Sequence, residues 1–187
     1  ARLLLPEQFG LVAMVSIFIQ MAKAFVDSGF PRALIQKDQV SHTDECSVFY
    51  FNILIAALVY GLLFILAPWV ARFYEQPPLT LILRVVSIGL IAAALGQIHQ
   101  TILTRELDFK RQAFVGWASI LVSGVVGIIL ARRGAGVWAL VAHQLSGACV
   151  RTVMLWIVSS WHPALKFSFA SLRSLFRFGS KLLASSL

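Results

Sequence analysis

The chain has 187 residues, of which 59% are hydrophobic and 13% charged, and its mean hydropathy is +0.83. A water-soluble domain carries about 45–50% apolar and about 25% charged residues, so this composition excludes an ordinary soluble globule. The net charge of +8 would suggest nucleic acid as a partner in a soluble protein. Here the positive residues lie mostly in short loops between apolar runs, which indicates a membrane protein with no nucleic-acid partner.

Several apolar segments are long enough to cross a bilayer, which takes about 20 residues. The predicted spans are residues 9–28, 46–71, 79–104, 112–131 and 137–159, and the second and fourth contain no Asp, Glu, Lys or Arg. The loops between them are too short to hold soluble domains, so consecutive helices must pack antiparallel. We therefore predict an all-α polytopic transmembrane helix bundle with five complete spans, forming one domain over residues 1–187.

Both ends of the chain look like pieces of further helices. Residues 1–5 resemble the end of a preceding helix, and the apolar run 179–187 resembles the start of another span. We expect the chain to be a fragment of a longer protein, with a partial helix at each end.

The first span is expected to stop at the Gly29-Phe30-Pro31 tripeptide, and a polar loop is expected over residues 32–45. Residues 165–178 differ from the other loops because apolar residues recur there at helical spacing, with cations between them. The apolar set is Leu165, Phe169, Leu172 and Phe176, and the cations are Lys166, Arg173 and Arg177. This pattern predicts an amphipathic helix on the inner membrane surface, with its cations near anionic headgroups. An ordinary connector is the alternative.

The distribution of Lys and Arg predicts the orientation of the bundle. One set of alternate loops holds Arg32, Lys37, Arg105, Lys110, Arg111, Lys166, Arg173, Arg177 and Lys181. The other set holds only Arg2, Arg72, Arg132 and Arg133. The positive-inside rule therefore places loops 32–45, 105–111 and 160–178 in the cytoplasm.

A few charged residues lie inside the predicted spans, where a charge at the helix centre costs about 2.5–3.5 kcal/mol. Lys23, Arg84 and Arg151 are candidate cations of a water-filled cavity that would attract an anionic substrate. The alternative for Lys23 and Arg84 is snorkelling, because each lies near enough to a span end for its head group to reach the interface.

Three further residues are candidates for the same interior. Asp27 stands four residues after Lys23, so it could pair with Lys23 or cap the helix end. Asn52 and Gln144 are uncharged polar residues within the second and fifth spans. Gly124 and Gly127 are expected to let helices approach closely, and to serve as flexible points only secondarily.

The sequence contains no P-loop, GxGxxG, HExxH, CxxC or GxSxG motif, so we predict no enzyme, no cofactor and no metal site. Four isolated histidines are interpreted as hydrogen-bonded packing residues, and both cysteines as packing residues. These are His42, His99, His143 and His162, with Cys46 and Cys149.

Several runs in the sequence together resemble a known family. These are PEQFGLVAM at 6–14, FVDSG at 25–29, ALIQ at 33–36, LAP at 66–68, ARFY at 71–74, RELDFKR at 105–111, GVWALV at 136–141 and FRFG at 176–179. They resemble bacterial polysaccharide exporters, the lipid-linked oligosaccharide flippases of the multidrug/oligosaccharidyl-lipid/polysaccharide superfamily. The resemblance is greatest to the branch of colanic-acid and lipopolysaccharide-biosynthesis exporters, and the charged run at 105–111 is its most specific part.

The resemblance implies a multi-pass protein of the bacterial inner membrane with two lobes, of which this chain would be most of the N-terminal one. It implies alternating access and a substrate of undecaprenyl-pyrophosphate-linked oligosaccharide repeats, whose pyrophosphate would meet Lys23, Arg84 and Arg151. Implied partners are membrane lipids, this substrate and other polysaccharide-assembly proteins. The alternatives are a cation-coupled multidrug exporter of the same superfamily and a membrane polysaccharide polymerase or ligase.

Overall fold

In the computed structural model, residues 6–27, 30–37 and 39–175 are described, and all their regular elements are helices. In chain order the helices are α1 (Pro6–Val26), α2 (Phe30–Gln36), α3 (His42–Phe73), α4 (Pro78–Arg105), α5 (Phe109–Arg132) and α6 (Val137–Val158), and residues 169–175 are also helical. Within this described part, α1, α3, α4, α5 and α6 are each long and apolar enough to cross a membrane. The prediction of an all-α polytopic bundle is confirmed.

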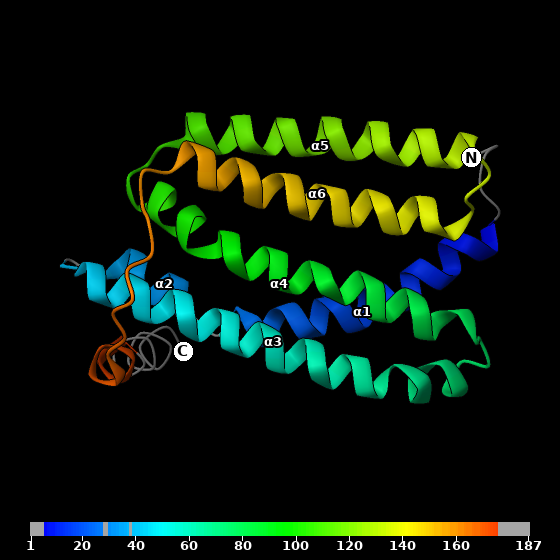
Figure 1. Ribbon diagram of the computed structural model, residues 1–187, viewed down its shortest axis with the longest axis horizontal. Coiled ribbons are helices and arrows are strands. Elements are labelled where there is room, and N and C mark those ends of the chain that lie inside the picture. Colours follow the sequence, from blue (N-terminus) through cyan, green and yellow to red (C-terminus); the bar gives the residue numbers. More distant parts are fainter. Residues whose placement is uncertain (1–5, 28–29, 38, 176–187) are drawn as a thin grey trace, which may run out of the picture.

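Helix α4 is the centre of the bundle, and it contacts each of the other helices from α1 to α6. The α5–α6 pair lies on one side of α4, while α1 and α3 lie on the other (Figure 1). The largest apolar core joins Leu79, Leu83 and Leu90 of α4 to Val15 of α1 and Leu63 of α3. Large apolar side chains such as Trp117 of α5 and Trp69 of α3 are exposed, as expected for a surface in contact with lipid.

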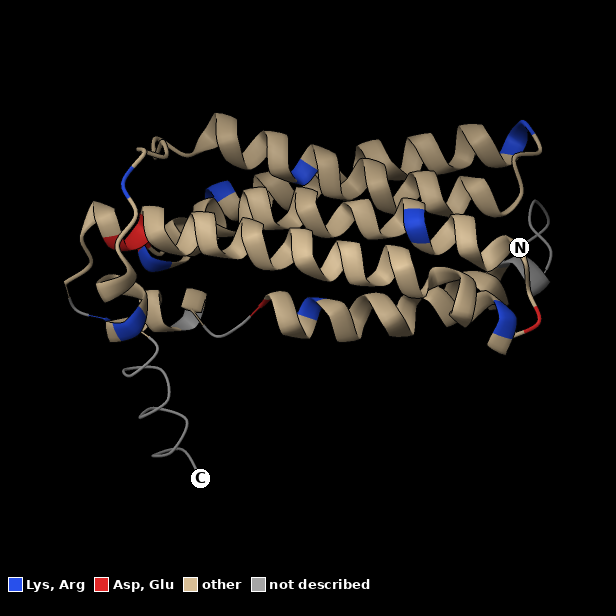
Figure 2. Ribbon diagram, turned by 60° about the horizontal axis from the view of Figure 1, so that its bottom comes forward, with Lys and Arg blue, Asp and Glu red and all other residues tan. Residues whose placement is uncertain are grey.

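The loops predicted to share one side of the membrane do lie at one end of the bundle. Helix α2, the start of α3, the α4–α5 turn and the segment after α6 meet there, and we call this the α2 end (Figure 1). The α3–α4 and α5–α6 turns lie at the opposite end. Figure 2 shows that Lys and Arg gather mainly at the two ends, with only a few within the helices.

The region 30–41 corrects the prediction of an uninterrupted polar loop over residues 32–45. Phe30–Gln36 forms helix α2, and α3 already begins at His42. Helix α1 ends at Val26, ahead of the predicted stop, and Pro31 lies in the first turn of α2, where its fixed φ suits a helix and its missing N–H removes no bond. Ser41 and Asp44 form a capping box that starts α3 ahead of its apolar segment.

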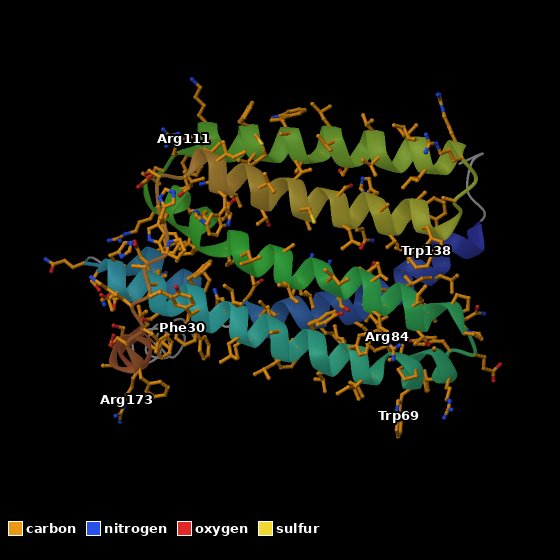
Figure 3. The ribbon with its side chains drawn as sticks, in the orientation of Figure 1. Phe30, Trp69, Arg84, Arg111, Trp138 and Arg173 are labelled. Carbon is orange, nitrogen blue, oxygen red and sulfur yellow. The ribbon has the colours of Figure 1, made fainter. Side chains whose placement is uncertain are left out.

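The segment after α6 also differs in part from its prediction. It is helical from residue 169, but Leu165 and Phe169 are exposed, whereas Leu172 and Leu175 are buried in a cluster with residues of α2, α3 and α4. Leu172 and Leu175 therefore pack against the bundle, while contact of the exposed Leu165 and Phe169 with the membrane surface stays a prediction. Figure 3 shows Arg173 pointing away from the bundle. The remainder of the predicted amphipathic helix, 176–178, and the partial span 179–187 lie outside the described residues.

Only some of the glycines lie where two helices approach closely. A Cβ atom at Gly127 would lie 3.2 Å from the Cβ of His143 on α6, so this glycine brings α5 and α6 together as predicted. A Cβ atom at Gly124 would meet nothing within 4 Å, so the packing role predicted for Gly124 is wrong. Gly96 is a stronger case, because its Cβ would lie 3.1 Å from Leu155 and 3.2 Å from Thr152 on α6.

Candidate functional site

A cavity of about 550 Å³ lies between α1, α4 and α6, with α5 contributing part of the wall. Its charged and amide-bearing lining residues are Gln20, Lys23, Asp27, Gln97, Gln100, Gln144 and Arg151. Small residues, including Gly89 and Gly147, line the space between them. This half-open chamber thus combines charged and amide groups with apolar side chains such as Ile19 and Leu145.

The α1 wall is a stripe of polar residues with helical period. Ser16, Gln20, Lys23 and Asp27 follow one another at intervals of three or four residues and all line the cavity. Lys23 and Asp27 are exposed, and in the described part of the chain no ion pair joins them. The expected pairing of these two residues is therefore not found, and both charges are free to face the chamber.

On the α6 wall, Arg151 is held by an amide of α4. Its Nη2 donates a hydrogen bond to Oε1 of Gln100 at 3.4 Å. The Gln100 amide is itself oriented, because its Nε2 donates to Oε1 of Gln112 at 2.8 Å, and Gln112 donates to Thr104 at 3.3 Å. Among the described residues Arg151 has no other hydrogen-bond partner. Most of its five N–H donors thus remain available to a bound group.

The residues predicted for the site are only partly brought together. Lys23, Asp27, Gln144 and Arg151 line the cavity. Asn52 does not, because it is buried within the bundle, with its Oδ1 lacking a hydrogen-bond partner.

Arg84 also lies away from the cavity. Its guanidinium carbon is 4.1 Å from the centre of the Phe64 ring, and its Nε donates to the Phe64 carbonyl oxygen at 3.3 Å. Figure 3 shows it beside the α3–α4 pair, toward the end opposite α2. This is a cation–π contact between helices, and it places the charge away from the predicted cavity.

Gln20, Gln97 and Gln100 line the cavity although sequence reasoning did not single them out. Amides within apolar spans are a usable signal, because lipid accepts them poorly. The spacing of Gln20 with Lys23, and of Gln97 with Gln100, would have placed each pair on one helix face.

No group of three or more His, Cys, Asp or Glu side chains that could hold a metal ion occurs in the part of the chain that the structure describes.

The fold and the cavity define a multi-pass α-helical membrane protein with a half-open chamber between its helices that contains charged and amide side chains. The chain belongs to the polysaccharide biosynthesis protein family, whose model matches residues 1–187. The family resemblance stated from the sequence is thereby confirmed.

Named relatives agree with this assignment. The succinoglycan biosynthesis transport protein ExoT of Rhizobium meliloti is 29% identical over 185 residues, which cover 99% of this chain and 37% of that protein. The teichuronic acid biosynthesis protein TuaB of Bacillus subtilis is 29% identical over 89% of this chain and 35% of its own length. The lipopolysaccharide biosynthesis protein WzxC of Escherichia coli is 23% identical over 100% of this chain and 38% of its own length. The name of ExoT describes a transport protein, in agreement with the prediction of a transport protein rather than an enzyme, and the names of TuaB and WzxC describe polysaccharide biosynthesis.

The chain spans little more than a third of the length of these relatives. No solved structure matches it significantly.

Proposed function

We propose that the protein containing this chain exports polysaccharide precursors across the bacterial inner membrane as lipid-linked oligosaccharide diphosphates. The observation that carries the proposal is the cavity between α1, α4 and α6, in which the Arg151 guanidinium is oriented by Gln100 and keeps most of its donors free. A diphosphate offers several negatively charged oxygens to such a group, and arginine binds phosphate oxygens through paired N–H donors.

The charges of the cavity favour an anion. Lys23 and Arg151 are its cations, and Asp27 is the one acidic residue among the lining residues that the structure describes. Opposite charges attract more strongly in this low-dielectric setting than in water. The composition therefore disfavours an exporter of organic cations, which would need an excess of carboxylates.

The amides of the cavity suit the saccharide part of such a substrate. Gln20, Gln97 and Gln144 line the same chamber, and each side chain offers two donors and one acceptor oxygen. Sugar hydroxyls both donate and accept hydrogen bonds, so a set of amides can bind them without adding charge.

The cations lie toward one end of the bundle. Lys23 is three residues from the end of α1, and Arg151 is seven residues from the end of α6, about 10 Å at 1.5 Å per residue. Both of these helix ends are at the α2 end. With the positive-inside orientation, the α2 end and loops 32–45, 105–111 and 160–178 would be cytoplasmic. The headgroup would then load from the side where it is made, and would be released after an alternating-access change. Partners in this scheme are membrane lipids and the enzymes that assemble the saccharide.

The test is replacement of Arg151 by Ala and by Lys in the whole protein, with the amount of exported polysaccharide measured at matched protein level. Loss of a hydrogen bond to a charged group costs about 1.5–3 kcal/mol, or roughly tenfold to a hundredfold in affinity. We expect Arg151→Ala to lower export strongly and Arg151→Lys to retain part of it. Undiminished export by Arg151→Ala would remove this residue from the mechanism. Loss of drug resistance with intact polysaccharide export would favour the multidrug alternative.

A further inference from the structure

His99 of α4 is completely buried, and neither nitrogen of its ring has a hydrogen-bond partner among the residues that the structure describes. Its ring centre lies 4.7 Å from that of Trp156 on α6 and 5.3 Å from that of Trp161, which follows α6. Arg105, the last residue of α4, lies six positions after His99. The imidazole therefore sits in an aromatic cluster near the α2 end, apart from the residues that line the cavity.

Histidine is a costly choice for this position. A buried polar group without a partner destabilises the folded state, and a leucine or phenylalanine would fill the same apolar surroundings without that loss. Imidazole differs from those side chains in that it gains charge within the physiological pH range. Packing alone would favour an apolar ring at position 99. The property that distinguishes an imidazole from such a ring is its ability to bind a proton.

We propose that His99 is a proton-binding site that opens the α2 end of the bundle when it is occupied. The unprotonated ring nitrogen takes a proton from hydronium, which yields an imidazolium and a water molecule. The two indoles attract this cation through their π faces, but a buried charge also requires hydration or hydrogen bonds. Protonation therefore favours a conformation in which Trp161 moves away from α4 and water reaches the ring.

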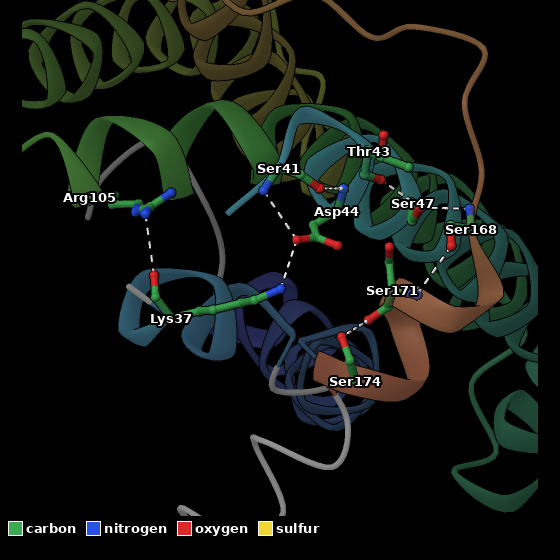
Figure 4. Close-up of polar contacts among 9 residues, drawn as sticks. All are labelled: Lys37, Ser41, Thr43, Asp44, Ser47, Arg105, Ser168, Ser171 and Ser174. Carbon is green, nitrogen blue, oxygen red and sulfur yellow. Dashed lines mark hydrogen bonds and ion pairs between the residues drawn. The ribbon is translucent and has the colours of Figure 1, made fainter. Parts of the chain in front are cut away.

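Trp161 belongs to the stretch of chain that follows α6 and passes the start of α3, which we call the crossing segment (residues 159–168). Its indole Nε1 donates to Oε2 of Glu45 at 2.8 Å, and its ring packs on Phe49 with a centroid distance of 5.5 Å. Farther along, the Ser168 N–H donates to Oγ of Ser47 at 2.9 Å. Figure 4 shows this last contact where the 169–175 helix meets the start of α3. Movement of Trp161 would therefore disturb the attachment of the crossing segment to α3.

The titratable groups around His99 come from three elements. Helix α3 contributes Glu45, bound to Trp161, and His42, whose ring centre lies 5.8 Å from that of Trp161. The crossing segment contributes His162, and α4 itself ends in Arg105. α6 presents the Trp156 indole. The carboxylate favours an imidazolium at position 99, while Arg105 and protonated forms of the other two histidines oppose it. The test must therefore separate His99 from its histidine neighbours.

Cys46 is a native reporter of this movement. Its side chain is fully buried, and its sulfur accepts a hydrogen bond of 3.3 Å from the backbone N–H of Ala164 in the crossing segment. The second thiol in the chain, Cys149, is exposed on α6 and must be replaced by serine. A thiol reagent can reach Cys46 only when the crossing segment has moved.

The experiment uses the whole protein in lipid nanodiscs, with Cys46 as its single cysteine. The rate of Cys46 modification by a methanethiosulfonate reagent is measured from about pH 7.5 to about pH 5. Each rate is divided by that of His99→Gln at the same pH, which cancels the pH dependence of the thiol chemistry. We expect this ratio to rise as the pH falls, by up to tenfold per pH unit, the limit for uptake of one proton. His42→Gln, whose Nδ1 lies 3.5 Å from the Cys46 sulfur, His162→Gln, and His143→Gln on the cavity side are the matched controls and should keep the rise.

A ratio that stays constant over this pH range would overturn the proposal. Loss of the rise in His162→Gln would also overturn it, because the response would then depend on His162. If His99→Gln fails to fold, His99→Phe takes its place, because an aromatic ring without nitrogens preserves the packing. None of these readouts depends on transport, so the outcome is independent of whether the protein exports a polysaccharide.

Discussion

Thr152 on α6 donates a hydrogen bond of 2.6 Å from its hydroxyl to the backbone carbonyl oxygen of Ala92 on α4. One turn farther along α6, the indole Nε1 of Trp156 donates to the carbonyl oxygen of Leu95 at 3.0 Å. Gly96 lies beside both contacts and lets the two backbones approach closely. These two hydrogen bonds therefore fix the part of α6 around Thr152 and Trp156 to the central helix α4.

Gly96→Ala should destabilise the bundle, because the added Cβ would lie 3.1 Å from Leu155 Cδ1 and 3.2 Å from Thr152 Oγ1. Overpacking of this kind costs about 1–3 kcal/mol. The free energy of unfolding in mixed micelles measures the effect. The matched control is Gly124→Ala on α5, where a Cβ meets nothing within 4 Å, and the change should stay within about 0.5 kcal/mol of zero. Equal losses in both variants would contradict the packing described for Gly96.

Arg84→Ala should leave polysaccharide export near its normal level, in contrast to Arg151→Ala. The Arg84 guanidinium contacts Phe64 of α3 and does not line the cavity. Its loss should instead lower stability by about 0.5–1 kcal/mol, the value of an exposed cation–π contact. Export and unfolding are measured on the same preparations. An export defect as large as that of Arg151→Ala would place Arg84 in the mechanism.

The α2 end should be cytoplasmic. Lys110 and Arg133 are both exposed and lie at opposite ends of α5. In a background without native cysteines, Lys110→Cys should resist a membrane-impermeant maleimide in intact cells, while Arg133→Cys should react. Both should react once the membrane is permeabilised. Labelling of Lys110→Cys in intact cells would reverse the orientation and the proposed loading side.

Asp44→Ala should cost more than Lys37→Met, although the two side chains form an ion pair of 2.8 Å (Figure 4). Asp44 also accepts a hydrogen bond of 3.2 Å from the Ser41 N–H in the capping box, and it is almost fully buried. We expect about 1–3 kcal/mol for Asp44→Ala and at most about 1 kcal/mol for Lys37→Met, measured as free energies of unfolding. A larger loss for Lys37→Met would show that the ion pair, rather than the cap, holds the start of α3.

The transmembrane helices could be predicted from the sequence because lipid imposes long uncharged segments, and the helices α3 to α6 contain the expected spans. Lys23, Gln144 and Arg151 could be chosen as cavity candidates for the same reason. Which of the charged residues actually reach the cavity depends on the register between helices. Arg84 meets Phe64 across the α3–α4 pair, twenty residues earlier in the chain, and the sequence of α4 alone does not reveal that contact.

The ends of the helices were harder to predict for a physical reason. Pro31 can stop a helix or begin one; here it lies in the first turn of α2, whose Phe30 and Leu34 pack against α3 and α4. The buried face of the last described helix likewise depends on the position of Leu175 beneath the start of α3. Tertiary packing decides these helix ends and buried faces, and the local spacing of apolar residues does not determine them.

The tight turns of the bundle have a consequence for its biosynthesis. Helices α3 and α4 pack directly on each other, as do α5 and α6, and each pair is joined by only a few residues that include Glu75 or Gly134 at positive φ. Each pair can therefore form a helical hairpin as soon as its second helix leaves the ribosome. Helix α1 is made before α4 but finds its largest contact surface there, so it must wait in the bilayer until α2, α3 and α4 have been synthesised. Assembly should thus proceed through an intermediate in which the polar stripe of α1 is still unpaired, when a nascent chain would be most vulnerable to quality-control proteases.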